Sequence, residues 1–251
     1  GFAGGRGVGG GGGGVGGGGG GDGGAGATGA GGAGVGGCPP CACGAWAETR
    51  VTDEGATASV PSLTWAGDHW GLAWQDGRGG NPEIYFARLS AAGARLGAEL
   101  RVTNDPADTL MPSLVWTGGQ HAIGYEDTRT GNSAAYLSSV EAGGQSLVLD
   151  LEVWKGSGAP KEAVLSWGGP SFGYVLGWQD FRDGGFKIHT GAVSEAGAVT
   201  GSDQRITDAT GDALHPALAY GDLEHGLVWQ DSRDADEEIY FARLDPTGLR
   251  I

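Results

Sequence analysis

A five-residue motif recurs four times along this chain and constrains its fold more than any other feature. The motif is Trp74-Gln75-Asp76-Gly77-Arg78, and related copies stand at residues 125–129, 178–182 and 229–233. Successive copies are 51, 53 and 51 residues apart, and the segment from Glu83 to Leu89 recurs unchanged at residues 238–244. Self-similarity at a fixed period of roughly 20–50 residues is typical of a repeat architecture.

Each repeat contains four short strand candidates separated by turn residues. In the first repeat these candidates are residues 62–65, 70–74, 83–89 and 99–103, with glycine-containing turns at 67–68, 79–81 and 92–93. Four strands in a period near 50 residues predict the blade of a β-propeller. We therefore expect an all-β fold of four four-stranded blades, each of roughly 51 residues, over the approximate ranges 53–103, 104–153, 154–207 and 208–251.

The second strand candidate of every repeat alternates large and small side chains. In the first repeat Trp70, Leu72 and Trp74 alternate with Gly71 and Ala73. Because alternate residues of a strand point to opposite faces of the sheet, the bulky side of one blade can fill the shallow side of its neighbour. This pattern predicts a blade core built from eight aromatic residues: Trp65, Trp74, Trp116, Tyr125, Trp167, Trp178, Tyr220 and Trp229.

The pattern of the fourth strand does not decide whether the blades form a closed ring. Copies of this strand are expected at residues 48–52, 99–103, 203–207 and 249–251, with a degenerate copy at 151–153. If the first copy completes the last blade, a four-bladed ring is possible. If the repeats belong to a larger propeller, they form an open arc, and we favour this second interpretation.

The first part of the chain has a different composition. From residue 1 to residue 44 roughly every second residue is glycine, so residues 1–46 are expected to form a disordered linker and residues 47–251 the propeller. The only cysteines are Cys38, Cys41 and Cys43. They lack the βαβ context of a redox site and the fourth ligand of a zinc site, so a local disulfide or an unpaired thiol is favoured.

The charge balance limits the possible partners. The formal net charge is −15, with 15 basic and 30 acidic residues, so no basic stripe is available for nucleic acid or for an anionic membrane surface. The sequence has no apolar run of about 18 residues, which argues against a transmembrane segment. Residues 1–37 also lack the apolar region of a signal peptide.

The repeat signature, Trp-Gln-Asp-x-Arg followed by Glu-Ile-Tyr-Phe-Ala-Arg-Leu, resembles propeller repeats of bacterial secreted and cell-surface proteins. It is loosely similar to the repeats of sialidase-like and TolB-like propellers, and the resemblance covers residues 50–251. The glycine-rich stretch resembles the spacer of a bacterial surface lipoprotein. These resemblances imply an extracytoplasmic protein, either secreted or held at the cell envelope.

Every repeat carries an acidic and a basic residue at the end of its second strand. We expect a structural role, in which the carboxylate accepts turn amides and the guanidinium bridges to a carboxylate. The alternative is a ring of four arginines around an anionic ligand, which would require the pairs to face the central channel. The pairs are Asp76/Arg78, Asp127/Arg129, Asp180/Arg182 and Asp231/Arg233.

Three further features are candidates for chemistry. The acidic turn with Asp231, Asp234 and Asp236 could bind calcium, although a solvated turn is the simpler interpretation and no cofactor is expected. Glu126 replaces the glutamine of the other three repeats and adjoins Asp127; it could be one of the two carboxyl groups that a glycosidase needs. Trp154, in a divergent segment, could be an exposed contact residue or the product of drift in a loop.

No catalytic constellation common to the repeats emerges from these features. The leading interpretation is therefore a non-catalytic propeller outside the cytoplasm, a platform that binds a protein or a glycan through its loops. The alternative is a glycan-active enzyme, sialidase-like or another glycosidase, that uses Glu126 and carboxylates at the mouth of the channel.

Overall fold

A computed structural model describes residues 48–53, 55, 57–144, 151–154 and 159–251 of the chain. The glycine-rich linker predicted over residues 1–46, its three cysteines and residues 155–158 lie outside these described residues. The described residues form fifteen β-strands and no helix. They accordingly contain no helix that could cross a membrane.

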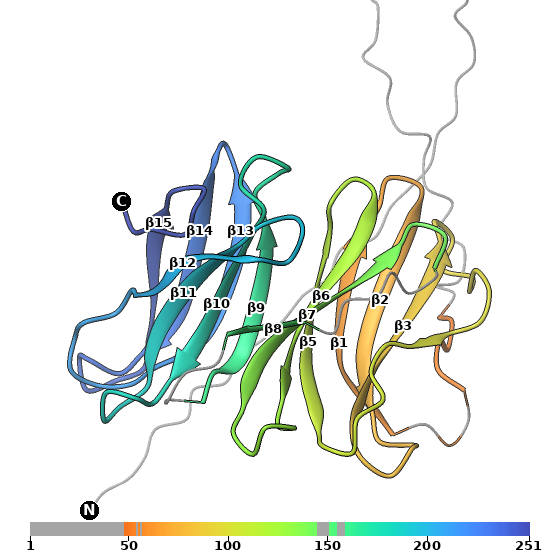
Figure 1. Ribbon diagram of the computed structural model, residues 1–251, viewed down its shortest axis with the longest axis horizontal. Helices are drawn as coiled ribbons and strands as arrows, with labels where there is room; N and C mark the ends of the chain where they lie inside the picture. Colours follow the sequence, from red (N-terminus) through yellow and green to blue (C-terminus); the bar gives the residue numbers. More distant parts are fainter. Residues whose placement is uncertain (1–47, 54, 56, 145–150, 155–158) are drawn as a thin grey trace, which may run out of the picture. The chain divides into compact units, whose positions relative to one another are not determined.

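The strands form four antiparallel sheets, and within each sheet the spatial order follows the sequence (Figure 1). Each sheet corresponds to one repeat, which confirms the prediction of an all-β propeller arrangement of four blades. Blade 1 is β1 (Ala58–Trp65), β2 (His69–Asp76), β3 (Glu83–Ser90) and β4 (Leu100–Arg101). Blade 2 is β5 (Thr109–Trp116), β6 (Gln120–Asp127), β7 (Ala134–Glu141) and β8 (Leu151–Trp154). Blade 3 is β9 (Lys161–Trp167), β10 (Tyr174–Asp180), β11 (Lys187–Val193) and β12 (Val199–Arg205), and blade 4 is β13 (Ala213–Gly221), β14 (Glu224–Asp231) and β15 (Glu238–Leu244).

Blade 4 corrects one detail of the predicted repeat. Residues 249–251 were expected to form a fourth strand, but Arg250 bridges to Leu244 in the way that Arg95 bridges to Leu89. Residues 249–251 therefore correspond to residues 94–96 of blade 1, which follow the third strand and precede the fourth.

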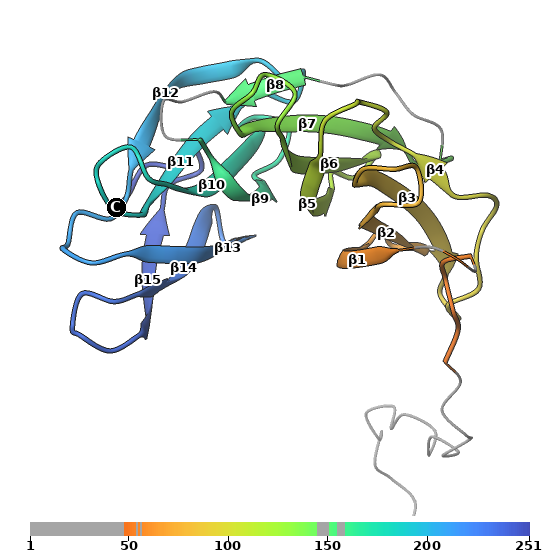
Figure 2. The same cartoon turned by 90° about the horizontal axis from the view of Figure 1, so that it is seen from below.

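Neighbouring blades contact one another along their first strands, β1 with β5, β5 with β9 and β9 with β13. Figure 2 shows the four blades as an arc that is open between blade 4 and blade 1. The interpretation of the repeats as an open arc therefore agrees with the arrangement of the described strands.

The predicted nesting of large and small faces is confirmed at the interfaces between blades. Ala73, Ile84 and Phe86 of blade 1 form one buried cluster with Ile123 and Tyr125 of blade 2. Equivalent clusters join blade 2 to blade 3 and blade 3 to blade 4. Because each large face covers its neighbour's shallow face, burial of apolar surface holds the stack together.

The aromatic residues predicted to form the blade core differ in burial. Trp74, Tyr125, Trp178 and Trp229 have exposed fractions of 2%, 0%, 0% and 4%, whereas Trp116, Trp167 and Tyr220 are half-buried. Trp65 is 42% exposed, so its assignment to the core was wrong. Its counterpart Trp116 contacts His69 of the preceding blade, and blade 1 has no described blade in front of it.

Trp154 was considered as an exposed contact residue, and this interpretation is also wrong. Only 9% of its surface is exposed, and its ring lies 5.1 Å from that of Trp178 in the next blade. The ring fills a space over Gly191, where an added Cβ would come within 2.5 Å of the indole. Trp154 is thus part of the packing between blades 2 and 3.

Candidate functional site

The first strand of every blade carries an unusual backbone position near its start. Val60, Met111, Glu162 and His215 have φ angles of 50°, 54°, 51° and 52°. Side chains other than glycine rarely adopt this left-handed conformation, and here it coincides with an irregularity in the pairing of the first and second strands. We call these four the bulge residues.

The bulge residues of the four blades come together around one hollow of about 310 Å³. Its wall also includes Pro61, Pro112 and Pro216, each of which follows a bulge residue. Since the first strands of the four blades are the ones that contact one another, this hollow lies where the blades converge. We call it the axial hollow.

A side chain from the preceding blade holds each of three bulges in place. The backbone N–H of Met111 donates to Gln75 Oε1 at 3.0 Å, and that of His215 donates to Gln179 Oε1 at 2.9 Å. Between these two blades, the N–H of Glu162 donates to Glu126 Oε2 at 3.4 Å. Glu126 therefore takes the structural place of the glutamine, but it brings a carboxyl group to the backbone of Glu162, which lines the axial hollow, and it is only 7% exposed.

The bulge residues differ in chemistry from blade to blade. Val60 and Met111 are apolar, whereas Glu162 and His215 are hydrogen-bonded to each other, with Oε2 and Nδ1 2.7 Å apart. Their side chains are 28% and 59% exposed, so both can meet a ligand in the axial hollow. The carboxylate of Glu162 is hydrogen-bonded to an imidazole, and the backbone N–H of Glu162 is hydrogen-bonded to the carboxyl group of Glu126. Two carboxyl groups and an imidazole in this arrangement can transfer a proton.

Glu126 and Asp127 are neighbours in the sequence, but their side chains point to opposite faces of the sheet because side chains alternate along strand β6. Asp127 is fully buried and accepts hydrogen bonds from the backbone N–H and Nε of Arg129 at 2.7 and 2.9 Å. The structure thus brings Glu126 together with Glu162 and His215, which the sequence analysis missed. Alignment of the repeats would have shown that residues 60, 111, 162 and 215 are equivalent and chemically different.

The four repeated acidic and basic pairs are bonded within their own blades. Asp231, for example, accepts from the backbone N–H of Arg233 at 3.0 Å and from its Nε at 2.8 Å. The hydrogen bond from the Arg233 guanidinium lowers the pKa of Asp231 to about 2. The same backbone bond, from the arginine N–H to the aspartate two residues before it, joins Arg78 to Asp76, Arg129 to Asp127 and Arg182 to Asp180.

Three of the arginines also lie over tyrosine rings. The guanidinium carbon is 4.4 Å from the ring centre for Arg78 over Tyr85, 4.4 Å for Arg129 over Tyr136 and 4.0 Å for Arg233 over Tyr240. Cation–π contacts of this kind add to the hydrogen bonds that fix the side chain. The guanidinium groups are therefore engaged at the turns, and the arrangement does not offer them as a ring for an anionic ligand.

The acidic turn considered for calcium does not gather its carboxylates. Asp231 faces Arg233 and the indole N–H of Trp229, and Asp234 accepts from the hydroxyl of Tyr240. Within the described part of the chain, no group of three or more His, Cys, Asp or Glu side chains, including one with Asp236, could hold a metal ion. The geometry gives no support to calcium at this turn.

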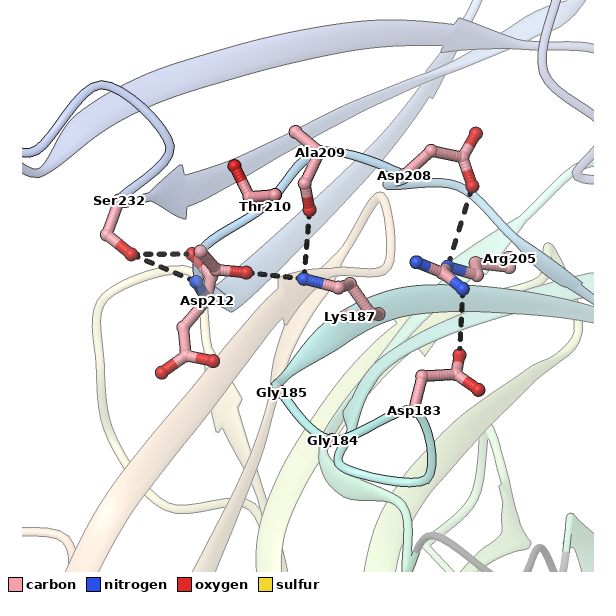
Figure 3. Close-up of a pocket in the computed structure, with 11 residues that line it drawn as sticks. Asp183, Gly184, Gly185, Lys187, Arg205, Asp208, Ala209, Thr210, Asp212 and Ser232 are labelled. Carbon is pink, nitrogen blue, oxygen red and sulfur yellow. Dashed lines mark hydrogen bonds and ion pairs between the residues drawn. The ribbon is translucent and has the colours of Figure 1, made fainter.

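A second hollow, of about 470 Å³, lies beside the turn between β10 and β11 and the loop that leads into β13 (Figure 3). The basic side chains that line this second hollow are already bonded to other groups of the protein. Lys187 Nζ donates to the backbone carbonyls of Ala209, at 3.0 Å, and Gly211, and Arg205 pairs with Asp183 at 3.1 Å (Figure 3). These contacts fix the loop, so the axial hollow is the better candidate for a functional site.

Fold and site together define a β-propeller protein with polar chemistry at the convergence of its blades. Among solved structures, the chain is similar to a thermostable family-43 glycoside hydrolase, with a TM-score of 0.53, 9% identity, and coverage of 78% of this chain and 72% of the other. It is also similar to an endo-arabinase from Bacteroides thetaiotaomicron (TM-score 0.53, 10% identity, coverage 76% and 78%). A family-43 endo-arabinanase from Bacillus licheniformis matches with a TM-score of 0.51 and 14% identity over 76% and 78% of the two chains.

No family model matches the sequence, and no curated protein matches it significantly. At these identities the structural matches establish a shared fold. They also contradict the leading sequence interpretation of a non-catalytic binding platform, because the similar structures are glycoside hydrolases. The enzymatic alternative therefore becomes the proposal, and the finer likeness to sialidase-like and TolB-like repeats stays a prediction.

Proposed function

We propose that this protein is a glycan-active enzyme, a glycoside hydrolase whose reaction takes place in the axial hollow. The observation that carries the proposal is the group formed by Glu162, His215 and Glu126. Glu162 Oε2 is 2.7 Å from His215 Nδ1, and the backbone N–H of Glu162 donates to the carboxyl group of Glu126. The fold shared with family-43 glycoside hydrolases supports the same conclusion.

Hydrolysis of a glycosidic bond requires two carboxyl groups, one to protonate the leaving oxygen and one to act on the water or the sugar. Glu162 is the more exposed of the two carboxyl groups, so it takes the proton of the attacking water, and its hydrogen bond to His215 Nδ1 orients the carboxylate. Glu126, which is 7% exposed, supplies the second carboxyl group. The apolar bulge residues Val60 and Met111 and the neighbouring prolines offer the flat apolar surface on which a sugar ring packs.

The experiment uses a folding-neutral variant that the repeat itself provides. Glu126→Gln restores the residue found at positions 75, 179 and 230, so the hydrogen bond to the bulge is kept while the carboxyl group is lost. Glu162→Gln removes the exposed carboxylate, and Glu195→Gln, at an exposed loop residue, is the matched control.

The purified full chain is assayed for release of reducing ends from arabinan, mannan, and aryl arabinofuranosides. We expect hydrolysis of at least one substrate, a loss of about 10²-fold or more in kcat for Glu162→Gln and for Glu126→Gln, and an unchanged rate for Glu195→Gln. Full activity of both variants would place the reaction elsewhere, and an inactive wild-type chain with all substrates would remove the proposal.

The substrate partner in this proposal is a glycan, and no protein ligand is required. Action outside the cytoplasm is supported by the resemblance of the glycine-rich stretch to a lipoprotein spacer and of the repeats to those of secreted propellers. Fractionation of the producing cells would test this part independently, with recovery in the cytosol as the contrary result.

A further inference from the structure

Blade 3 differs from the other blades at the turn between its second and third strands. Phe181 and Phe186 flank this turn, with their ring centres 5.0 Å apart, and Phe181 is 52% exposed. The other blades form the same turn without an aromatic residue, so the fold does not require this pair. Their residues at the two positions are Gly77, Thr128 and Ser232 in place of Phe181, and Pro82, Ser133 and Glu237 in place of Phe186.

The same turn forms one wall of the second hollow, the one of about 470 Å³ (Figure 3). Asp183, Gly184 and Gly185 line it, and they lie between the two phenylalanines in the sequence. The backbone N–H of Phe186 donates to Oδ1 of Asp212, another lining residue, at 2.8 Å. The aromatic pair therefore adjoins the hollow.

A glycine in blade 3 leaves the hollow unfilled. In blade 1 the side-chain amide of Asn81 donates to the backbone carbonyls of Asp105 and Ala107, at 2.9 and 2.6 Å. Gly185 has the place of Asn81 in blade 3. A Cβ added to Gly185 would come within 3.1 Å of Asp212 Oδ1, so a side chain at this position would fill part of the hollow.

The charge of a second lining residue is reversed between the two blades. Glu83 of blade 1 is fully buried and pairs with Arg101 at 2.9 Å. In blade 3 the residue at this position is Lys187, so the arginine that corresponds to Arg101 has no buried carboxylate to bind. This arginine, Arg205, pairs with the more exposed Asp183 at 3.1 Å. Figure 3 shows the polar ends of Lys187 and Arg205 facing each other across the hollow.

The hollow offers both donors and acceptors to a ligand. Among the described residues, Nζ of Lys187 has two acceptors, the carbonyls of Ala209 and Gly211, so its third N–H is available. Nη2 of Arg205 also makes no bond to this part of the chain. Two cations beside three carboxylates favour a neutral ligand with many hydroxyl groups over an anion. The carboxylates belong to Asp183, Asp208 and Asp212.

The second hollow lies close to the axial hollow. Asp212 lines the second hollow, and His215, three residues later in the chain, lines the axial hollow. Three residues of extended chain span at most about 11 Å. A chain of a few linked sugars that occupies the axial hollow can therefore reach the second hollow.

We propose that the second hollow and the pair of Phe181 and Phe186 form an accessory subsite for a neutral glycan chain. Phe181 packs on the apolar face of a sugar ring, while Lys187, Arg205 and the carboxylates bond to its hydroxyl groups. This inference rests on the proposed function, because the bond that is hydrolysed lies in the axial hollow. It adds that the substrate is a polymer rather than the glycoside of a single sugar.

Two variants that introduce residues of other blades remove the accessory subsite. Phe181→Ser introduces the residue of blade 4, and Gly185→Asn introduces the residue of blade 1. The matched controls, Phe172→Ser and Gly119→Asn, make the same changes at exposed turns between the first and second strands, at the other end of blades 3 and 2. We expect all four variants to keep the urea midpoint of the parent chain within about 0.5 kcal/mol of stability.

Binding is measured by affinity electrophoresis of the full chain in gels that contain arabinan or mannan. A Glu162→Gln background keeps the polymer intact. We expect the Kd for at least one polymer to rise about tenfold in Phe181→Ser and in Gly185→Asn, and to stay within about twofold in both controls. In the active chain the same two variants should raise KM about tenfold and change kcat less than about twofold, because the accessory subsite lies away from the bond that is hydrolysed.

The outcomes separate this inference from the proposed function. Unchanged Kd values in Phe181→Ser and Gly185→Asn would overturn the accessory subsite, even in a chain that hydrolyses the polymer. A parent chain that binds neither polymer would also overturn it, as would a fall in kcat at constant KM, which would place the turn in the reaction itself. A parent chain that binds a polymer through these two positions but hydrolyses nothing would support the accessory subsite and remove the proposed function.

Discussion

Substitution of Gly71 by alanine is the sharpest test of how the blades stack. A Cβ added at Gly71 would lie 2.6 Å from Nδ1 of His121, far inside normal contact distance. The His121 ring is fully buried in the next blade, with the rings of Phe86 and Trp116 at 5.0 and 4.7 Å, so it has little room to move. Overpacking of this kind costs typically about 1–3 kcal/mol.

Alanine also stabilises a strand relative to glycine by about 0.5–1 kcal/mol, because the unfolded chain has less freedom to lose. The expected net effect of Gly71→Ala is therefore a loss of about 1–2 kcal/mol in the free energy of unfolding. Urea unfolding followed by tryptophan fluorescence measures this loss, provided that the slope of the transition is unchanged.

Gly124→Ala is the matched control, because the nearest atom to its added Cβ is Leu165 Cβ at an ordinary 3.4 Å. We expect this variant to change stability by no more than about 0.5 kcal/mol. In a His121→Ala background the cost of Gly71→Ala should disappear, which a double-mutant cycle detects. A cost that persists without the His121 ring, or a fully stable Gly71→Ala protein, would refute the nesting of the faces.

Two further predictions concern pH and the repeated pairs. Burial lowers the pKa of His121 from an ordinary 6.5 to about 4, so the unfolded chain binds a proton more readily than the folded one. The contribution of His121 to the free energy of unfolding is therefore complete above pH 6.5, and about 3 kcal/mol is lost as the pH falls to 4. The variant His121→Phe should abolish this loss, which urea titrations at each pH measure. The hydrogen bond from Arg233 depresses the pKa of Asp231, so its contribution is present above pH 3.8 and lost as the pH falls towards 2. Asp231→Asn should cost about 1–3 kcal/mol at pH 7 and flatten the decline between pH 4 and pH 2; an equally steep decline in that variant would contradict the role of the pair.

The spacing of the repeat was enough to predict the class of fold and the three inner strands of each blade, whereas the fourth strand expected at residues 249–251 is absent from blade 4 as the structure describes it. The alternation of bulky and small residues in the second strand also predicted which faces meet, because side chains of a strand alternate between its two faces whatever surrounds the sheet. This local rule is the reason that Trp74, Tyr125, Trp178 and Trp229 were placed correctly in the core.

The tertiary structure alone decided what depends on a neighbouring blade. Trp65 and Trp116 have the same place in the repeat, but only Trp116 has a blade in front of it, so only tertiary context separates an exposed tryptophan from a half-buried one. The pair of Glu162 and His215 likewise joins two residues that lie 53 positions apart. Sequence periodicity shows which residues are equivalent, whereas the packing of one blade on the next determines which of them meet.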